Sequence, residues 1–127
     1  MSESKFVVLC VDDDSDVRFV LRGQLEFGGY EVVEAENCES ALAAFESRKP
    51  DALIIDLMME ELDSGLSLIR DLHARGNTSP VFLLSSQGDS LAKTTDLAHF
   101  GVAGILQKPV KTDVLLPLVK ANMGQSS

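Results

Sequence analysis

The clearest structural pattern in this chain is the stretch Asp51-Ala52-Leu53-Ile54-Ile55-Asp56-Leu57-Met58-Met59. Its apolar run, residues 52–55, has no polar face, which is typical of a strand buried on both sides within a parallel sheet. A single acid, Asp56, follows at the carboxyl end of the run. Ligands of open α/β sheets bind at that edge, so Asp56 is the first candidate for chemistry.

Four further apolar runs alternate with segments of helical spacing. The expected strands cover residues 6–11, 30–35, 80–84 and 102–107, in addition to the run before Asp56. Each strand is followed by apolar residues three and four positions apart, which predicts five helices. The helix expected between Asp89 and Gly101 is the weakest, because Thr94 and Thr95 lower its helix propensity. This alternation predicts a doubly wound α/β fold with a five-stranded parallel sheet and right-handed crossovers.

Composition and charge narrow the class of protein. A chain of 127 residues with 45% hydrophobic residues suits one globular domain, residues 1–127 with a core over 6–123, and leaves no room for an output domain. The net charge of −9 argues against binding to a nucleic-acid phosphate backbone.

No apolar run reaches the ~20 residues that cross a bilayer. Cys10 and Cys38 lack the spacing of a metal site or a disulfide framework. We therefore expect a cytoplasmic protein.

Polar residues that could do chemistry follow four of the expected strands. They are Asp12 and Asp13, Asp56, Ser85, and Lys108. If the strand order is 2-1-3-4-5, the first and third strands are neighbours, so the three acids converge. Each close pair of carboxylates repels by about 4 kcal/mol at an effective dielectric of 20, so the cluster needs a cation or a proton. Oxygen ligands of this kind suit Mg²⁺.

Each of these motifs has an ordinary structural interpretation when it is taken alone. The run Asp12-Asp13-Asp14-Ser15-Asp16 is typical of a helix cap, Ser85 of a turn, and Lys108-Pro109 of a surface corner. Their occurrence together, at the ends of separate strands, favours a functional site.

The combination resembles the receiver domain of two-component response regulators. The residues that carry the resemblance are Val11-Asp12-Asp13-Asp14, Ile55-Asp56-Leu57-Met58-Met59, Leu84-Ser85-Ser86 and Gln107-Lys108-Pro109, and their spacing covers residues 6–123. The resemblance implies the flavodoxin-like (CheY-like) receiver fold, with the strand order 2-1-3-4-5.

The resemblance also implies a phosphoryl-transfer site with a bound Mg²⁺. Asp56 would accept a phosphoryl group from a phosphohistidine and form an acyl phosphate. Asp13, Asp56 and the backbone carbonyl of Met58 would bind Mg²⁺ directly, and Asp12 would act mainly through a bound water. The implied partners are a sensor histidine kinase or a histidine phosphotransfer protein, and a downstream protein target.

Lys108 and Ser85 would complete this site. Lys108 would pair with Asp56 and later with a phosphoryl oxygen, and Ser85 would donate a hydrogen bond to another oxygen. The Lys108-Pro109 pair resembles a family site that is often cis. Such a domain assists its own phosphorylation and dephosphorylation without being a turnover enzyme.

The sequence departs from the family pattern at several positions, among them Ser85, where Thr is commoner. Receivers usually have Pro where this chain has Glu60, a Gly one place before Gly65, and often an aromatic residue where this chain has Ile105. We expect Ile105 and Leu116 to expose apolar surface on the face formed by the helix before the last strand, the last strand and the last helix. That face is a candidate surface for a partner or a dimer.

Three other functions remain open from the residues. The first is a receiver-like module that binds a protein without being phosphorylated. The second is a Mg²⁺-dependent phosphatase with an Asp nucleophile, although such enzymes commonly place the nucleophile after the first strand and need a substrate cap. The third, a flavin or nucleotide carrier, is disfavoured, because it needs a phosphate-binding loop where this chain has three acids.

Overall fold

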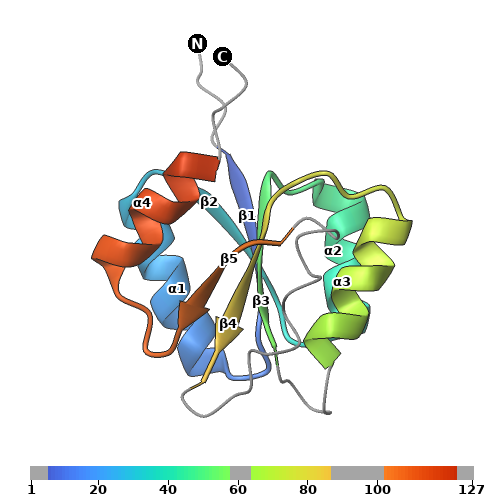
Figure 1. The fold of residues 1–127 in the computed structure, drawn as a ribbon, viewed down its shortest axis with the longest axis horizontal. Helices are drawn as coiled ribbons and strands as arrows, with labels where there is room; N and C mark the ends of the chain where they lie inside the picture. The colour runs from blue at the N-terminus through green and yellow to red at the C-terminus, as the bar shows by residue number, and fades with distance from the viewer. Residues whose placement is uncertain (1–5, 58–63, 87–101, 123–127) are drawn as a thin grey trace.

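The computed structural model describes residues 6–57, 64–86 and 102–122 of the chain. These residues form a central parallel sheet covered by helices on both faces (Figure 1). Three features expected from the sequence lie outside the described residues. They are the Met58 carbonyl, the position of Glu60, and the helix between Asp89 and Gly101.

The described sheet has five parallel strands. These are β1 (Val7–Val11), β2 (Glu31–Ala35), β3 (Ala52–Asp56), β4 (Val81–Ser85) and β5 (Val102–Gln107), and their spatial order is β2-β1-β3-β4-β5. The predicted doubly wound receiver fold is therefore confirmed. Val11 of β1 lies opposite Ile55 of β3, so the carboxyl ends of these two strands lie side by side.

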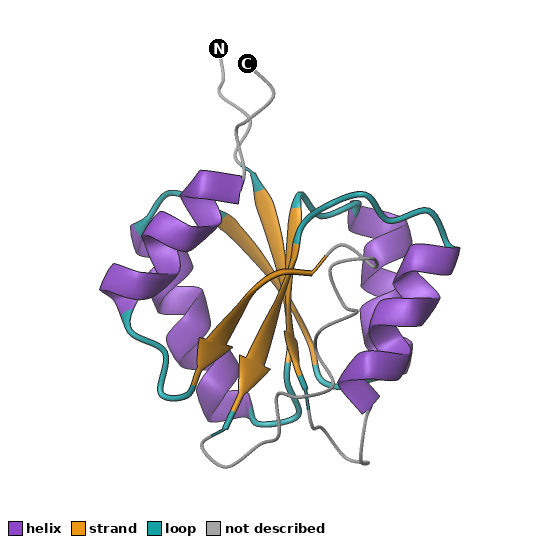
Figure 2. Ribbon diagram, viewed as in Figure 1, coloured by secondary structure: helices purple, strands orange, loops and turns teal. Residues whose placement is uncertain are grey.

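Two pairs of helices cover the two faces of the sheet. Helices α1 (Ser15–Phe27) and α4 (Thr112–Asn122) lie on one face, and α2 (Cys38–Arg48) and α3 (Ser64–Ala74) lie on the other (Figure 2). Ile54 packs with the α1 and α4 residues, whereas Leu53 and Ile55 pack with those of α2 and α3. Successive strand residues point to opposite faces, so the run before Asp56 must be apolar throughout.

The first two helices begin at capping residues. Asp14 caps α1 and accepts a hydrogen bond from the Asp16 amide at 2.9 Å. Asn37 caps α2, and its side chain and that of Ser40 bond to each other's backbone amides. These caps satisfy amide donors that the first turn of a helix leaves unpaired.

Three strands begin one residue later than the sequence predicts: β1 at Val7, β2 at Glu31 and β4 at Val81. Tyr30 was expected in β2, but its amide donates to the Leu25 carbonyl at 3.0 Å and closes the end of α1 instead. Pro80 was expected in β4 but has no amide hydrogen to donate; its carbonyl accepts from the Leu53 amide at 3.0 Å, just before the strand starts. Both residues therefore flank the strands rather than extend them.

The apolar surface expected around β5 is present only in part. Ile105 is 38% exposed. Leu116 is partly buried, because it packs against the core beside Gly28 at the end of α1. Of the two residues expected to expose apolar surface here, Ile105 does so and Leu116 does not. Among the helices of the described residues, none has the length and apolar character needed to cross a membrane.

Candidate functional site

Three carboxylates meet at the carboxyl edge of the sheet. Asp12 and Asp13 follow β1, and Asp56 is the last residue of β3. One carboxylate oxygen from each residue lies within 4.8 Å of the others. Asp12 and Asp56 are buried, whereas Asp13 is exposed. The structure therefore brings together all three acids that the sequence singles out.

Lys108 reaches the buried side of this cluster. Its Nζ lies 3.0 Å from Asp12 Oδ2 and 3.4 Å from Asp56 Oδ2. Burial of the ammonium lowers the pKa of Lys108, but the two carboxylates raise it by more, so the pKa lies above its ordinary value. Lys108 is therefore cationic at neutral pH. The sequence led us to expect pairing with Asp56, and the structure adds the shorter contact with Asp12.

The backbone places Lys108 and Ser85 at the same edge. Ser85 ends β4 and is buried, and its carbonyl accepts a hydrogen bond from the Lys108 amide at 2.9 Å. The Ser85 hydroxyl donates to the Ser86 carbonyl at 3.3 Å. The Lys108-Pro109 peptide bond is cis, as expected. Because β4 lies between β3 and β5, Ser85 comes from the strand next to that of Asp56.

The backbone and one oxygen of Asp12 are held by neighbouring groups. The Asp12 amide donates to the Ala35 carbonyl at 3.1 Å, and Asp12 Oδ1 accepts from the Asp14 amide at 2.9 Å. Asp12 Oδ2 is buried, and among the described residues it has no aligned hydrogen-bond donor, so its contact with Lys108 is a charge pair. This oxygen can therefore take a further cationic ligand.

The donor set fits a hard divalent cation. Three carboxylates against one ammonium leave two negative charges uncompensated, and the available ligand atoms are all oxygens. Mg²⁺ prefers oxygen ligands and is commonly held by a small number of carboxylates. The acidic cluster can thus hold a metal ion, and its charge balance favours a divalent one.

A comparison with known families agrees with this geometry. A family model described as the response regulator receiver domain matches residues 8–120. The chain belongs to this family.

Curated relatives of this receiver domain include longer proteins. It is 35% identical over 120 residues to the response regulator MprA of Mycobacterium sp. (strain KMS), which covers 94% of this chain and 51% of that protein. It is 38% identical over 114 residues to MprA of Mycobacterium bovis (strain BCG / Pasteur 1173P2), covering 90% and 49%. The chain therefore spans about half the length of these relatives.

Solved structures show the same fold. A response regulator receiver protein from Pseudomonas putida aligns with a TM-score of 0.83 at 31% identity, covering 94% of this chain and 99% of that chain. The receiver domain of NtrX from Brucella abortus aligns with a TM-score of 0.84 at 28% identity, with the same coverage.

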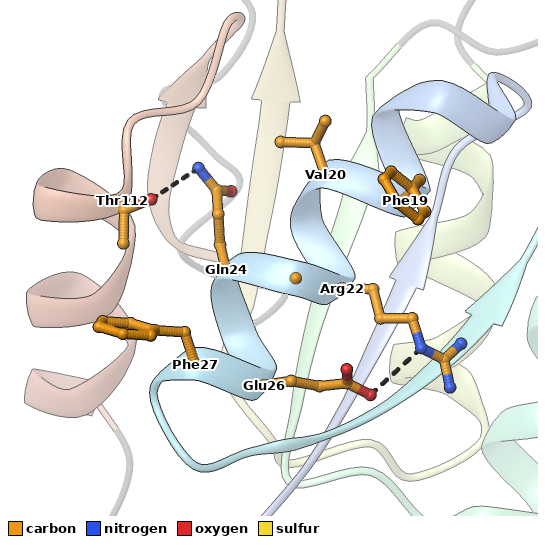
Figure 3. Close-up of a pocket in the computed structure, with 8 residues that line it drawn as sticks. Phe19, Val20, Arg22, Gln24, Glu26, Phe27 and Thr112 are labelled. Carbon is orange, nitrogen blue, oxygen red and sulfur yellow. Dashed lines mark hydrogen bonds and ion pairs between the residues drawn. The ribbon is translucent and has the colours of Figure 1, made fainter.

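The outer face of α1 in this receiver domain carries an exposed apolar hollow of about 650 Å³. Phe19 and Phe27 flank it and are 76% and 83% exposed (Figure 3). Gln24 projects from the same helix, and its Nε2 donates to Thr112 Oγ1 at 3.0 Å (Figure 3). The same Nε2 donates to the Val110 carbonyl at 2.9 Å. These bonds tie α1 to the segment after Pro109. Exposed apolar surface of this kind is typical of a protein contact site.

The sequence reasoning missed Arg18. Its guanidinium donates to the Asp12 carbonyl, and its Nε donates to Glu34 Oε1 at 3.0 Å. The sequence does place an arginine in the first turns of the helix that follows the acidic motif. The residue type and position do not, however, indicate that the Arg18 side chain turns back to bond the end of β1.

Proposed function

We propose that this receiver domain takes a phosphoryl group from a phosphohistidine onto Asp56. The observation that carries the proposal is the position of Asp56, which ends β3 beside two other carboxylates with the Lys108 ammonium 3.4 Å away. A carboxylate in that position can act as a nucleophile, and a cation beside it can stabilise the charge of the incoming group.

The proposed reaction uses residues of this chain at each step. A carboxylate oxygen of Asp56 attacks the phosphorus, the phosphorus–nitrogen bond of the phosphohistidine breaks, and the imidazole leaves with the electron pair and takes up a proton. Lys108 is cationic at neutral pH, so it can pair with a phosphoryl oxygen. The Ser85 hydroxyl can donate to another of these oxygens, because it lies at the adjacent strand end.

Mg²⁺ is the proposed cofactor. Asp13 and Asp56 would bind the ion directly, Asp12 mainly through water, and the Met58 carbonyl is assigned to it by the family resemblance alone. When bound, Mg²⁺ neutralises charge on the carboxylates and on the phosphoryl oxygens. The support in this structure is the uncompensated charge of the cluster and the buried Oδ2 of Asp12.

The proposed partners are a sensor histidine kinase or a histidine phosphotransfer protein, and a downstream protein target. The domain would assist its own phosphorylation and dephosphorylation but would not turn over a separate substrate. The exposed Ile105 of β5 marks a surface for the downstream target or for a second copy of the chain.

Phosphorylation with a small phosphodonor tests this proposal. The protein is incubated with Mg²⁺ and phosphoramidate or acetyl phosphate, and the phosphorylated species is detected by intact-protein mass spectrometry. The expected product forms on the wild-type protein and is lost in Asp56→Asn. Asp51→Asn is the matched control, because Asp51 lies at the opposite end of β3, where it accepts a hydrogen bond from the Val7 amide at 2.8 Å. That variant should still be phosphorylated.

A wild-type protein that forms no such product, or a product that persists in Asp56→Asn, would contradict the proposal. The first outcome would favour a module that binds its partner without phosphorylation. Steady hydrolysis of small phosphate esters would instead indicate a phosphatase.

A further inference from the structure

We propose that Arg18 is a positioning residue for the metal site, because it holds the peptide group that joins Asp12 to Asp13. The Arg18 guanidinium donates through Nη1 to the Asp12 carbonyl oxygen. That carbonyl and the Asp13 amide belong to one planar peptide unit. A group that fixes the carbonyl therefore fixes the direction in which the chain continues to Asp13. This inference rests on the proposed function, since it concerns the residues that would hold Mg²⁺.

Asp13 depends on its backbone more than the other two acids do. Lys108 contacts the carboxylates of Asp12 and Asp56. Within residues 6–57, 64–86 and 102–122, the exposed carboxylate of Asp13 has no hydrogen bond or ion pair. The position of its oxygens relative to the cluster is thus set by the backbone, and Arg18 holds that backbone from the side of α1.

Arg18 is itself held in one orientation. Its side chain is only 13% exposed, and its Nε lies 3.0 Å from Glu34 Oε1. Glu34 belongs to β2 and also accepts from Arg22 Nη1 at 2.7 Å. The hydrogen bond from Arg22, with that from Arg18, holds the pKa of Glu34 below its ordinary value, so Glu34 is anionic at neutral pH. The Arg18 guanidinium, bonded to Glu34 and to the Asp12 carbonyl, can therefore hold β2 and the end of β1 in a fixed relative position.

Arg22 supplies a matched control for this role. Like Arg18, it projects from α1 and forms an ion pair with Glu34. Its described contacts are with Glu34 and Glu26, and it makes none with Asp12. Removal of either arginine takes one positive charge and one Glu34 contact from the protein. Only removal of Arg18 frees the Asp12 carbonyl.

The test compares Arg18→Met with Arg22→Met by isothermal titration calorimetry of Mg²⁺ at low ionic strength. We expect Arg18→Met to bind Mg²⁺ about ten-fold more weakly than wild type, a loss typical of residues that orient metal ligands. Arg22→Met should bind as wild type does. Loss of the Arg18 charge alone would strengthen Mg²⁺ binding, because removal of a nearby cation favours the binding of another cation. Unchanged or tighter binding by Arg18→Met would therefore overturn the proposal.

A readout without metal separates this proposal from the proposed function. Amide hydrogen exchange, followed by NMR in metal-free protein, should be faster at Asp14, whose amide donates to Asp12 Oδ1, in Arg18→Met than in wild type and unchanged in Arg22→Met. If wild type failed to bind Mg²⁺ but this exchange pattern appeared, the proposed metal role would fail while the positioning of the peptide would stand. Equal exchange in both variants would refute the positioning.

Arg18→Lys addresses the case in which Arg18→Met does not fold. This variant keeps the charge, but its ammonium lacks the planar fork that serves both acceptors. We expect it to remain folded by circular dichroism and to show weakened Mg²⁺ binding. Wild-type Mg²⁺ affinity in Arg18→Lys would show that charge, not orientation, is what Arg18 supplies.

Discussion

The ammonium of Lys108 lies 3.0 Å from Asp12 Oδ2, a buried oxygen contributed by the other end of the chain. Lys108 therefore has a structural role that does not depend on the proposed phosphoryl transfer. It compensates charge at the most buried acid of the cluster, and the proposed Mg²⁺ would share that task.

Lys108→Met should destabilise the metal-free protein. Loss of the ammonium leaves Asp12 buried without its cation, and because Lys108 is 22% exposed we expect a cost of about 2 kcal/mol, below that of a fully buried pair. Urea unfolding measures this cost. Added Mg²⁺ should reduce it, since the more negative cluster binds the ion more tightly in the variant.

Lys111→Met is the control for Lys108→Met, because Lys111 is exposed and lies three residues farther along the chain. Lys111→Met should change the free energy of unfolding very little, with or without Mg²⁺. A Lys108→Met penalty that does not change on addition of Mg²⁺ would argue against an ion at this cluster.

Gly23→Ala should stabilise the protein by about 0.5–1 kcal/mol, because alanine lowers the entropic cost of folding inside a helix. Gly23 lies within α1, and outside its own stretch of that helix no atom of the described residues lies within 4 Å of the position where its Cβ would stand. Gly29→Ala, which also has open space, should destabilise the protein, because its φ of +93° is strained for alanine. Thermal unfolding of the two variants measures the contrast, and equal effects would contradict this account.

Glu34→Gln should show a penalty that depends on pH. The pKa of Glu34 is held below its ordinary value of 4.5, mainly by the hydrogen bond from Arg22. The stabilisation that the ionised Glu34 gives the folded state is therefore complete above pH of about 4.5, and it is lost as the pH falls through the folded-state pKa. We expect a penalty of about 1 kcal/mol at pH 7 that shrinks below pH of about 4.5.

Urea unfolding across this pH range checks the Glu34 prediction. Glu36→Gln is the control, because Glu36 is exposed and its described hydrogen bond uses the backbone amide rather than the carboxylate. Its penalty should stay near zero at every pH. A loss of unfolding free energy in Glu34→Gln that grew as the pH fell would contradict this prediction.

The two cysteines should differ in reactivity. Cys10 is fully buried in β1, and burial raises the pKa of its thiol well above the ordinary value, which suppresses the reactive thiolate. Cys38 is partly exposed at the start of α2. A thiol reagent applied to the native protein should modify Cys38, and peptide mapping should find Cys10 modified only after unfolding in urea. Comparable native rates at both thiols would contradict the buried position of Cys10.

Much of the fold could be predicted because local sequence patterns carry it. The uninterrupted apolar run before Asp56 indicated a strand buried on both faces, and its residues do alternate between the two cores. A helix cap within the run from Asp12 to Asp16 could be identified, because capping is a local hydrogen bond that depends on neighbouring residues. The predicted starts of β2 and β4 were each wrong by one residue. The Tyr30 amide bonds to the end of α1 instead of joining β2, and Pro80 has no amide hydrogen with which to join β4.

Which residues reach the carboxyl edge of the sheet follows from the alternation of strands and helices along the chain, because a parallel α/β sheet places the carboxyl end of every strand at that edge. Tertiary structure decided which side chains touch at that edge. The closer approach of Lys108 to Asp12 than to Asp56, the hold of Arg18 on the Asp12 carbonyl, and the burial of Leu116 are contacts between separate elements. They depend on how α1, α4 and the strand ends pack in three dimensions, and no local period in the sequence encodes that packing.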